Sequence, residues 1–400
     1  MIGHPEDGYP ATAGMLASVA HAAMPAPDQV RGGTPERPTP ASEAADGPSP
    51  GRTRPADPDG VADREPFGLV AGWWPVAFSS EVYASPRGVR LGGRQIVVYR
   101  DEGRVVRALT DRCPHRRMPL SMGTVTSAGL RCGYHGWVFD GASGRCTVIP
   151  DLGPETPSGR IGVPAHPVSE EGGFVFVWTG SGTPQPLTPV LPVAGWERVQ
   201  PSRQVVRGVV EARAAHTELS EALLVNPGAA LGLGWLLGGG DEMLGPEVVL
   251  DAAGVAARRC RLTWSLPRLG TYDPVSKRTT VSTTATTAAT GMTTTLAETP
   301  AGRTVARVVV GLTPVGAYRT TVRWRVETLG LGSRLASASC CLTVAGRPLT
   351  GRMAHRLETA ADGAGNGCDP AVQRLRELRA ALVTTPGLPA SAAKDPKEVR

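Results

Sequence analysis

Hydrophobic residues between about residue 73 and residue 180 fall into short runs that glycine and proline interrupt. The runs are rich in β-branched and aromatic residues and cover residues 72–79, 89–91, 95–100, 104–110, 137–139 and 174–178. Short runs of this kind, bounded by turn-forming residues, are typical of β-strands. We therefore predict a small all-β domain over residues 66–183.

The pattern changes after a proline-rich segment at residues 184–201, which we interpret as a linker. Residues 212–225 and 370–382 have helical composition, whereas residues 305–313 and 320–327 have the composition of strands. Strands that lie between helices indicate a second domain of the α+β class over residues 202–385.

Two segments of this second domain have unusual composition. Ten of the seventeen residues 279–295 are threonine, whose β-branched side chain favours strands. We expect an exposed pair of strands here, with a hydroxyl-lined pocket as the alternative. Residues 231–240 contain five glycines, so a mobile loop is expected there.

Both ends of the chain are predicted to be disordered tails, at residues 1–65 and 386–400. The first 60 residues contain eleven prolines and few large apolar side chains. Such a segment cannot bury enough surface to offset the entropy lost on ordering.

The overall composition excludes several classes of protein. Lys and Arg (42) exceed Asp and Glu (36) only slightly, without a block of like charge, so no nucleic-acid partner is expected. The most apolar stretch, residues 223–240, is interrupted by Asn226, Pro227 and glycines, so no membrane span is expected. Seven irregularly spaced cysteines do not fit a disulfide scaffold, and no signal peptide is evident. We therefore expect a cytoplasmic protein.

Four residues in the first domain have the spacing of metal ligands. Cys113-Pro-His115 is followed, after sixteen residues, by Cys132-Gly-Tyr-His135. Thiolates and imidazoles in this number hold either zinc or a [2Fe-2S] cluster in which two histidines replace two cysteines. The remaining cysteines show no ligand spacing and are interpreted as small buried hydrophobes: Cys146, Cys260, Cys340, Cys341 and Cys368.

The residues around these four favour the cluster. Cys113-Pro-His-Arg-Arg-Met-Pro-Leu and Cys132-Gly-Tyr-His-Gly-Trp resemble, almost residue for residue, the two cluster loops of Rieske non-haem iron oxygenases of the α-subunit type. Respiratory Rieske proteins carry a further cysteine in each loop, and neither loop has one here. The resemblance is strong from Trp73 to Trp178 and weaker beyond.

The resemblance implies that Cys113 and Cys132 hold one iron of a [2Fe-2S] cluster and that His115 and His135 hold the other. Neutral imidazoles raise the reduction potential of the cluster, which can then accept an electron from a ferredoxin or a flavin reductase. Gly136 and Trp137 are expected to lie against the cluster, with an ordinary core position for Trp137 as the alternative. The second domain is expected to be a helix-grip (START-like) antiparallel sheet with helices.

In this family the second domain also holds a mononuclear iron on two histidines and an aspartate, with an open position for dioxygen. The ligand helix reads Asp-x-x-His-x-x-x-x-His, often followed by Pro-Gly. In this register Glu218 stands at the aspartate, Glu221 at the first histidine and Asn226 at the second.

The number of histidines in the second domain leads to the same conclusion and does not depend on the alignment. After residue 200 the sequence contains only His216 and His355, so a His-x-x-x-x-His pair cannot form. The third ligand position falls at Met353, with Glu358 five residues further on. We expect the mononuclear Fe(II) to be absent, with Glu218 as a possible bridging carboxylate.

Three functions remain open from the sequence. The first is an electron-transfer subunit that serves a catalytic oxygenase chain in a hetero-oligomer, a trimer or a hexamer. The second is a self-contained oxygenase, a hydroxylase or demethylase, with a nonstandard iron site of His216, Glu221 and His355. The third is a non-enzymatic subunit that stabilises an oxygenase partner.

Overall fold

The computed structural model describes residues 69–83, 85–153, 157–180, 183–187, 204–237, 248–252, 255–264, 271–273, 278–298, 302, 304–328, 346–364 and 369–382. The two predicted tails, at residues 1–65 and 386–400, lie outside these ranges, as does most of the predicted linker. Of the helices in these ranges, none combines the length and the hydrophobicity that crossing a membrane requires.

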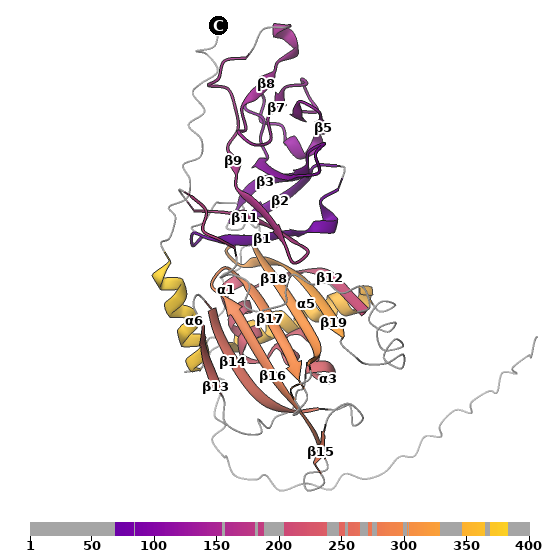
Figure 1. Ribbon diagram of the computed structural model, residues 1–400, viewed down its shortest axis with the longest axis vertical. Helices are drawn as coiled ribbons and strands as arrows, with labels where there is room; N and C mark the ends of the chain where they lie inside the picture. The colour runs from indigo at the N-terminus through magenta and orange to yellow at the C-terminus, as the bar shows by residue number, and fades with distance from the viewer. Residues whose placement is uncertain are drawn as a thin grey trace, which may run out of the picture. The chain divides into compact units, whose positions relative to one another are not determined.

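The first domain consists of three small antiparallel sheets (Figure 1). The first has the order β1 (Trp73–Phe78), β11 (Phe174–Trp178), β10 (Val168–Glu171). The second has the order β2 (Arg87–Leu91), β3 (Arg94–Arg100), β4 (Val106–Thr110), β9 (Ala165–His166). The third has the order β5 (Thr124–Thr126), β6 (Gly129–Arg131), β7 (Val138–Phe139), β8 (Cys146–Val148). Three short 3-10 helices connect strands: η1 (Ser79–Glu81), η2 (Leu120–Met122) and η3 (Pro150–Leu152).

Apolar packing fixes these sheets to one another. All residues of β1 and β11 are buried, which explains why their sequences are continuous apolar runs rather than alternating ones. A separate cluster of buried side chains includes Leu120, Leu130 and Phe139 together with Cys113 and Cys132. The two cysteine loops are therefore held on a hydrophobic core.

The second domain is built on an eight-stranded antiparallel sheet. Its order is β12 (Gln204–Ala212), β19 (Arg319–Thr328), β18 (Thr304–Gly316), β17 (Met292–Glu298), β16 (Arg278–Ala288), β14 (Val255–Trp264), β13 (Val248–Ala252), and β15 (Thr271–Asp273) pairs with β16. Its helices are α1 (His216–Val225), α2 (Pro227–Leu231), α3 (Gly234–Leu237), α5 (Gly346–Ala364) and α6 (Pro370–Ala381).

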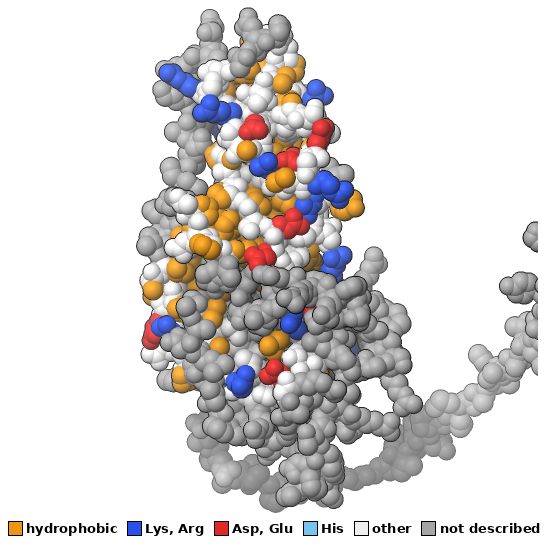
Figure 2. Space-filling model, viewed as in Figure 1, with side chains coloured by type: hydrophobic (Ala, Val, Ile, Leu, Met, Phe, Trp, Pro, Cys, Tyr) orange, Lys and Arg blue, Asp and Glu red, His pale blue; other side chains and the backbone are white. Residues whose placement is uncertain are grey.

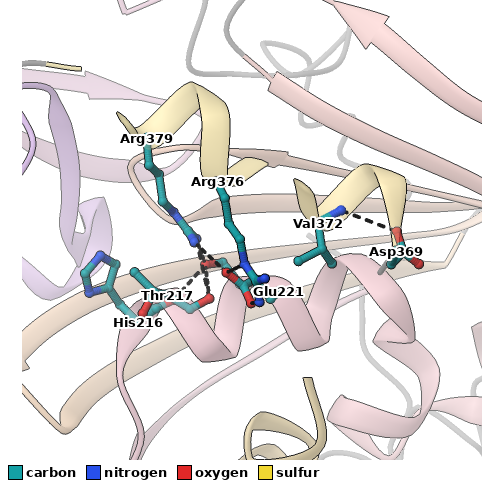
Figure 3. Close-up of polar contacts among 8 residues, drawn as sticks. His216, Thr217, Glu221, Asp369, Val372, Arg376 and Arg379 are labelled. Carbon is teal, nitrogen blue, oxygen red and sulfur yellow. Dashed lines mark hydrogen bonds and ion pairs between the residues drawn. The ribbon is translucent and has the colours of Figure 1, made fainter. Parts of the chain in front are cut away.

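The helices pack on the sheet through two apolar clusters. The larger cluster joins Leu219 and Leu223 of α1 to Leu357 of α5 and to strand residues such as Trp324. The smaller cluster places Leu375 of α6 against β14 and α1. These contacts put α1 and α6 beside each other, as Figure 3 also shows.

The predicted fold class is confirmed: an all-β domain is followed by an antiparallel sheet with helices, which together are α+β. The helix predicted from residue 212 begins at His216, because residues up to Ala212 complete β12. The glycine-rich segment predicted as a loop contains helix α3, and its residues 238–240 lie outside the described ranges.

The prediction of an exposed threonine-rich strand pair is wrong. Strands β16 and β17 have neighbours on both sides in the sheet, and Thr287 and Thr294 are fully buried. The Thr287 hydroxyl is accommodated by a contact of 3.2 Å with the Thr293 hydroxyl, whereas the Thr294 hydroxyl is buried without a hydrogen-bond partner among the described residues. Composition alone did not reveal that the run occupies central strands.

Hydrogen bonds join the two domains along β19 and β18. Arg323 donates from Nε to the Glu81 carboxylate at 2.9 Å and from Nη1 to the Thr313 hydroxyl at 2.9 Å. Thr313 in turn donates to the Pro75 carbonyl at 2.6 Å.

Charged groups on the face shown in Figure 2 are of both signs and interspersed with hydrophobic side chains.

The start of the predicted linker packs against the first domain. The Trp73 indole donates to the Gln185 carbonyl at 2.7 Å, and Leu187 is buried in a cluster that includes Trp73 and Trp178. Residues 188–203 are outside the described ranges.

Candidate functional site

Two loops of the first domain have the same backbone hydrogen bonding. The N–H of Cys113 and the N–H of Cys132 each donate to the carbonyl of the fifth residue after them, at 2.8 Å in both loops. The carbonyls of these cysteines accept from the fourth residue after them, Arg117 at 2.8 Å and Gly136 at 3.2 Å. Arg117 and Gly136 both have a positive φ, of 59° and 71°. The two loops are thus matching structures.

This matched geometry brings the two thiols together in the core. Cys113 and Cys132 are 2% and 3% exposed, and their side chains lie within hydrogen-bonding reach of each other. Burial raises the pKa of Cys113 to about 12, although the backbone N–H groups of His115 and Arg116 oppose the rise. The described cysteines form no disulfide.

The two histidines of the motif also lie together. The ring centroids of His115 and His135 are 4.5 Å apart, and Trp137 stacks on His115 with an interplanar angle of 6° and a centroid distance of 4.7 Å. The Nδ1 atom of His115 is buried without any hydrogen-bond partner. Burial lowers the pKa of His115, so the ring is neutral at pH 7 and Nδ1 is free to act as a ligand atom.

These features fit a [2Fe-2S] cluster. Such a cluster takes only two protein ligands on each iron, and here two thiols form one pair and two imidazoles the other. Two thiols buried this deeply need a bound cation to exist as thiolates, and a buried ring nitrogen without a partner needs a ligand to satisfy it. Within the described ranges no group of three His, Cys, Asp or Glu side chains could hold a single metal ion.

The second domain has a different polar cluster, between α1 and α6 (Figure 3). The Glu221 carboxylate is 6% exposed and accepts two hydrogen bonds from Arg376, from Nη2 at 2.7 Å and from Nε at 3.1 Å. Arg379 donates from Nη1 to the same carboxylate at 3.2 Å and from Nη2 to the Ser220 hydroxyl. Two guanidinium groups therefore surround one carboxylate.

The charges of this cluster are mutually stabilised. Hydrogen bonds and Coulomb attraction from Glu221 raise the pKa of Arg376. Burial lowers the pKa of Arg379 to about 10, while Glu221 opposes that change. Both arginines remain cationic at pH 7, so Glu221 is neutralised by protein groups.

Comparison with known proteins agrees with the description of the first domain. Residues 72–167 match the model of the Rieske [2Fe-2S] domain. The chain is 43% identical over 110 residues to 4beta-methylsterol monooxygenase of Methylococcus capsulatus, over 26% of this chain and 30% of that protein. The fold is similar to that of dicamba monooxygenase bound to dicamba, with a TM-score of 0.60, 19% identity, and coverage of 77% of this chain and 96% of the other. This chain contains a Rieske [2Fe-2S] domain. The earlier resemblance to the family is thereby confirmed.

A second solved structure has the same fold. It is the reduced complex between oxygenase and ferredoxin in carbazole 1,9a-dioxygenase, with a TM-score of 0.54, 16% identity, and coverage of 80% of this chain and 90% of the other. The matches to curated Rieske proteins span between 18% and 33% of those proteins' length. The sequence likeness is thus concentrated in the Rieske domain.

The three positions that the sequence register assigns to the mononuclear iron ligands make other contacts in the structure. Glu221 is held by the two arginines. The Asn226 side chain accepts from the Ala229 N–H at 3.0 Å and caps α2. Met353 is 2% exposed and belongs to the apolar cluster between α1, α5 and the sheet. These side chains do not fit a mononuclear iron site.

The neighbouring carboxylates are engaged with the backbone. Glu218 accepts from the Ala215 N–H at 3.2 Å at the start of α1, where an acidic side chain is favoured by the helix dipole. Glu358 of α5 accepts from the Arg213 N–H at 2.7 Å.

The alternative site of His216, Glu221 and His355 is not brought together among the described side chains. His216 packs edge-on against Trp74, with ring centroids 5.2 Å apart, and burial lowers the pKa of His216 to about 3. His355 is exposed on α5.

Sequence reasoning missed two functional features. Arg376 and Arg379 are three residues apart on α6, which places them on one helix face, but nothing in their spacing identified Glu221 as their partner. The positive φ of Arg117 was also missed, although its counterpart Gly136 stands in the equivalent position of the other loop.

Proposed function

We propose that this chain is an electron-transfer component of a Rieske oxygenase system, without a mononuclear iron of its own. Cys113 and Cys132 hold one iron of a [2Fe-2S] cluster, and His115 and His135 hold the other. When bound, this cluster supplies a one-electron carrier with a higher potential than an all-cysteine cluster.

The residues around the cluster have distinct parts in this proposal. The buried cysteines keep water from one side, and the ring of Trp137 fixes the orientation of His115 by stacking on it. His135 is only half-buried and lies against the exposed ring of Tyr134, with a centroid distance of 3.8 Å. The histidine side is therefore where an electron would enter and leave.

The observation that carries the proposal is the pairing of Glu221 with Arg376 and Arg379. A guanidinium is a permanent cation, and two of them beside one carboxylate oppose the binding of a dication there. A carboxylate that already accepts three N–H groups also has little donor capacity left for a metal. Dioxygen activation must then occur on a different chain.

The proposal implies two kinds of partner. A ferredoxin or a flavin reductase reduces the cluster by one electron and is itself oxidised by one electron. A catalytic Rieske oxygenase chain, joined in a hetero-oligomeric trimer or hexamer, receives that electron. The carbazole 1,9a-dioxygenase structure, which contains an oxygenase and a ferredoxin, supports the first kind of partner by analogy.

The experiment is a comparison of the chain alone and mixed with a catalytic Rieske oxygenase chain from the same organism. Alone, the chain should lose its visible cluster absorbance when a reduced ferredoxin is added, but it should turn over no substrate. In the mixture, Cys113→Ser in this chain should abolish turnover, while Cys146→Ser, at a buried cysteine without ligand spacing, should not.

A self-contained oxygenase, acting as a hydroxylase or demethylase, is the second candidate. The fold likeness that covers 96% of the dicamba monooxygenase chain favours it. Turnover of an organic substrate by this chain alone would establish it. A mixture that keeps its activity with Cys113→Ser, but loses it when this chain is left out, would indicate the third role, a non-enzymatic stabilising subunit.

A further inference from the structure

The first domain contains a cavity that the cluster does not use. It has a volume of about 190 Å³, which equals roughly six water molecules. Its walls come from the β2–β3 turn, from β9 and from the end of β11, elements that Figure 1 labels. Most of the wall is apolar, formed by Leu91, Ile96, Pro164, Pro167 and Val177.

One charged group lines this cavity. The Arg94 side chain, at the start of β3, makes no hydrogen bond or ion pair with the residues that the structure describes, and burial lowers the pKa of Arg94. Its guanidinium is nevertheless charged at pH 7, because an arginine stays protonated in proteins. No aspartate or glutamate is among the lining residues. Among the described residues, the positive charge in this cavity therefore has no counter-ion.

A second group of the cavity lacks a partner. Trp178 is 8% exposed, and its Nε1 is buried without any hydrogen-bond acceptor. An indole N–H can only donate, so this atom requires an acceptor to be satisfied. A Cβ at Gly180 would lie 2.8 Å from Nε1, so a side chain at position 180 would occupy the space beside this donor.

The third polar group is an uncharged imidazole. Burial and, to a smaller extent, the nearby charge of Arg94 lower the pKa of His166 to about 4. Arg94 and His166 both line the cavity. His166 Nε2 is 3.1 Å from the Thr110 hydroxyl, which holds the ring in place.

We propose that this cavity binds a small organic carboxylate, with Arg94 and Trp178 as its donors. An unpaired guanidinium and an unpaired indole N–H together match the two oxygens of a carboxylate. The apolar walls match a hydrocarbon body and disfavour a multiply charged inorganic anion such as phosphate. The site lies in the Rieske domain and is independent of whether the second domain holds iron.

The test is calorimetric titration of the full chain with benzoate, and with benzamide and inorganic phosphate as comparison ligands. Benzoate should bind, and benzamide should bind at least about tenfold more weakly, because it has no charge for Arg94 to pair with. Phosphate should also bind at least about tenfold more weakly than benzoate.

Two variants assign the binding to this cavity. Arg94→Gln should weaken benzoate binding by about tenfold or more, and Trp178→Phe, which keeps an aromatic ring but removes the donor, by about threefold to tenfold. Arg160→Gln, at an exposed arginine, removes the same charge elsewhere and should leave the affinity within about twofold.

Several outcomes would overturn the proposal. They are the absence of benzoate binding at millimolar concentration, equal affinity for benzoate and benzamide, tighter binding of phosphate than of benzoate, and benzoate binding that Arg94→Gln leaves unchanged. The ligand comparison on the unmodified chain keeps the proposal testable even if a variant fails to fold.

Discussion

Arg117 and Gly136 stand at equivalent positions in the two cysteine loops, each four residues after its cysteine and each with a positive φ. Glycine adopts this conformation freely, whereas a residue with a Cβ is strained in it. The two loops therefore share one backbone conformation but differ in conformational strain. The first loop has an arginine where the second has glycine.

Replacing Arg117 with glycine should stabilise the protein by about 0.5–1 kcal/mol, because relief of strain exceeds the added entropy of the unfolded chain. Gly136→Ala should destabilise it by about 1–2 kcal/mol, and its Cβ would also lie 3.2 Å from Pro150 Cγ. Urea denaturation measures both. Arg116 lies beside Arg117 but has no positive φ, so Arg116→Gly should not stabilise the protein. Equal stabilisation by Arg116→Gly and Arg117→Gly would contradict the assignment of backbone strain to Arg117.

His135→Cys should retain a cluster and lower its reduction potential by on the order of 100 mV, because an anionic thiolate replaces a neutral imidazole. Redox titration followed by electron paramagnetic resonance measures the change. Tyr134→Phe keeps the aromatic contact with His135 and should shift the potential far less. An unchanged potential in His135→Cys would exclude His135 as a ligand.

Glu221→Gln should destabilise the protein by about 3 kcal/mol, because it leaves two guanidinium groups, one of them buried, without their carboxylate. Arg374→Gln on the same helix provides a matched control. Its ion pair with Glu377 is solvent-exposed and should be worth about 0.5 kcal/mol or less. Urea denaturation that gives similar losses for both variants would contradict the role assigned to Glu221.

Much of the first domain could be predicted because its strands and ligand loops are each determined by a few consecutive residues. The continuous apolar runs of β1 and β11 and the two ligand loops are each contained within a few residues. The loss of the usual mononuclear iron ligands is likewise a prediction from the sequence, since only two histidines follow residue 200. The four proposed cluster ligands remain a prediction that iron analysis must test.

The rest depended on contacts between distant residues. Glu221 and Arg379 come from different helices far apart in the chain, so neither sequence window indicates their pairing. The burial of Thr287 and Thr294 is set by strands on either side of β16 and β17. The cavity lined by Arg94 and Trp178 likewise exists only because β3 and β11 meet in space.

The contact between Glu81 and Arg323 should make the protein sensitive to acid. Burial acts to raise the pKa of Glu81, but Arg323, the Phe78 N–H and Arg87 outweigh it and lower the pKa below 4.5. A carboxyl group with a depressed pKa stabilises the folded state above its unfolded pKa and loses this contribution as the pH falls through its folded pKa.

The free energy of unfolding should therefore be about 2 kcal/mol lower in Glu81→Gln than in the unmodified protein at pH 7. The difference should shrink below about pH 4.5. Glu102→Gln, at an exposed residue, should show no such difference. A gap between Glu81→Gln and the unmodified protein that stays constant down to pH 3 would contradict the assignment.

The central claim is that this chain carries a Rieske cluster and no mononuclear iron, and its most direct test is the iron content of anaerobically purified protein. The account predicts about two irons and two acid-labile sulfides per chain. It also predicts that Cys113→Ser removes both irons together, whereas Glu221→Gln removes none. A third iron per chain, retained in Cys113→Ser and lost in His216→Ala, would contradict the account.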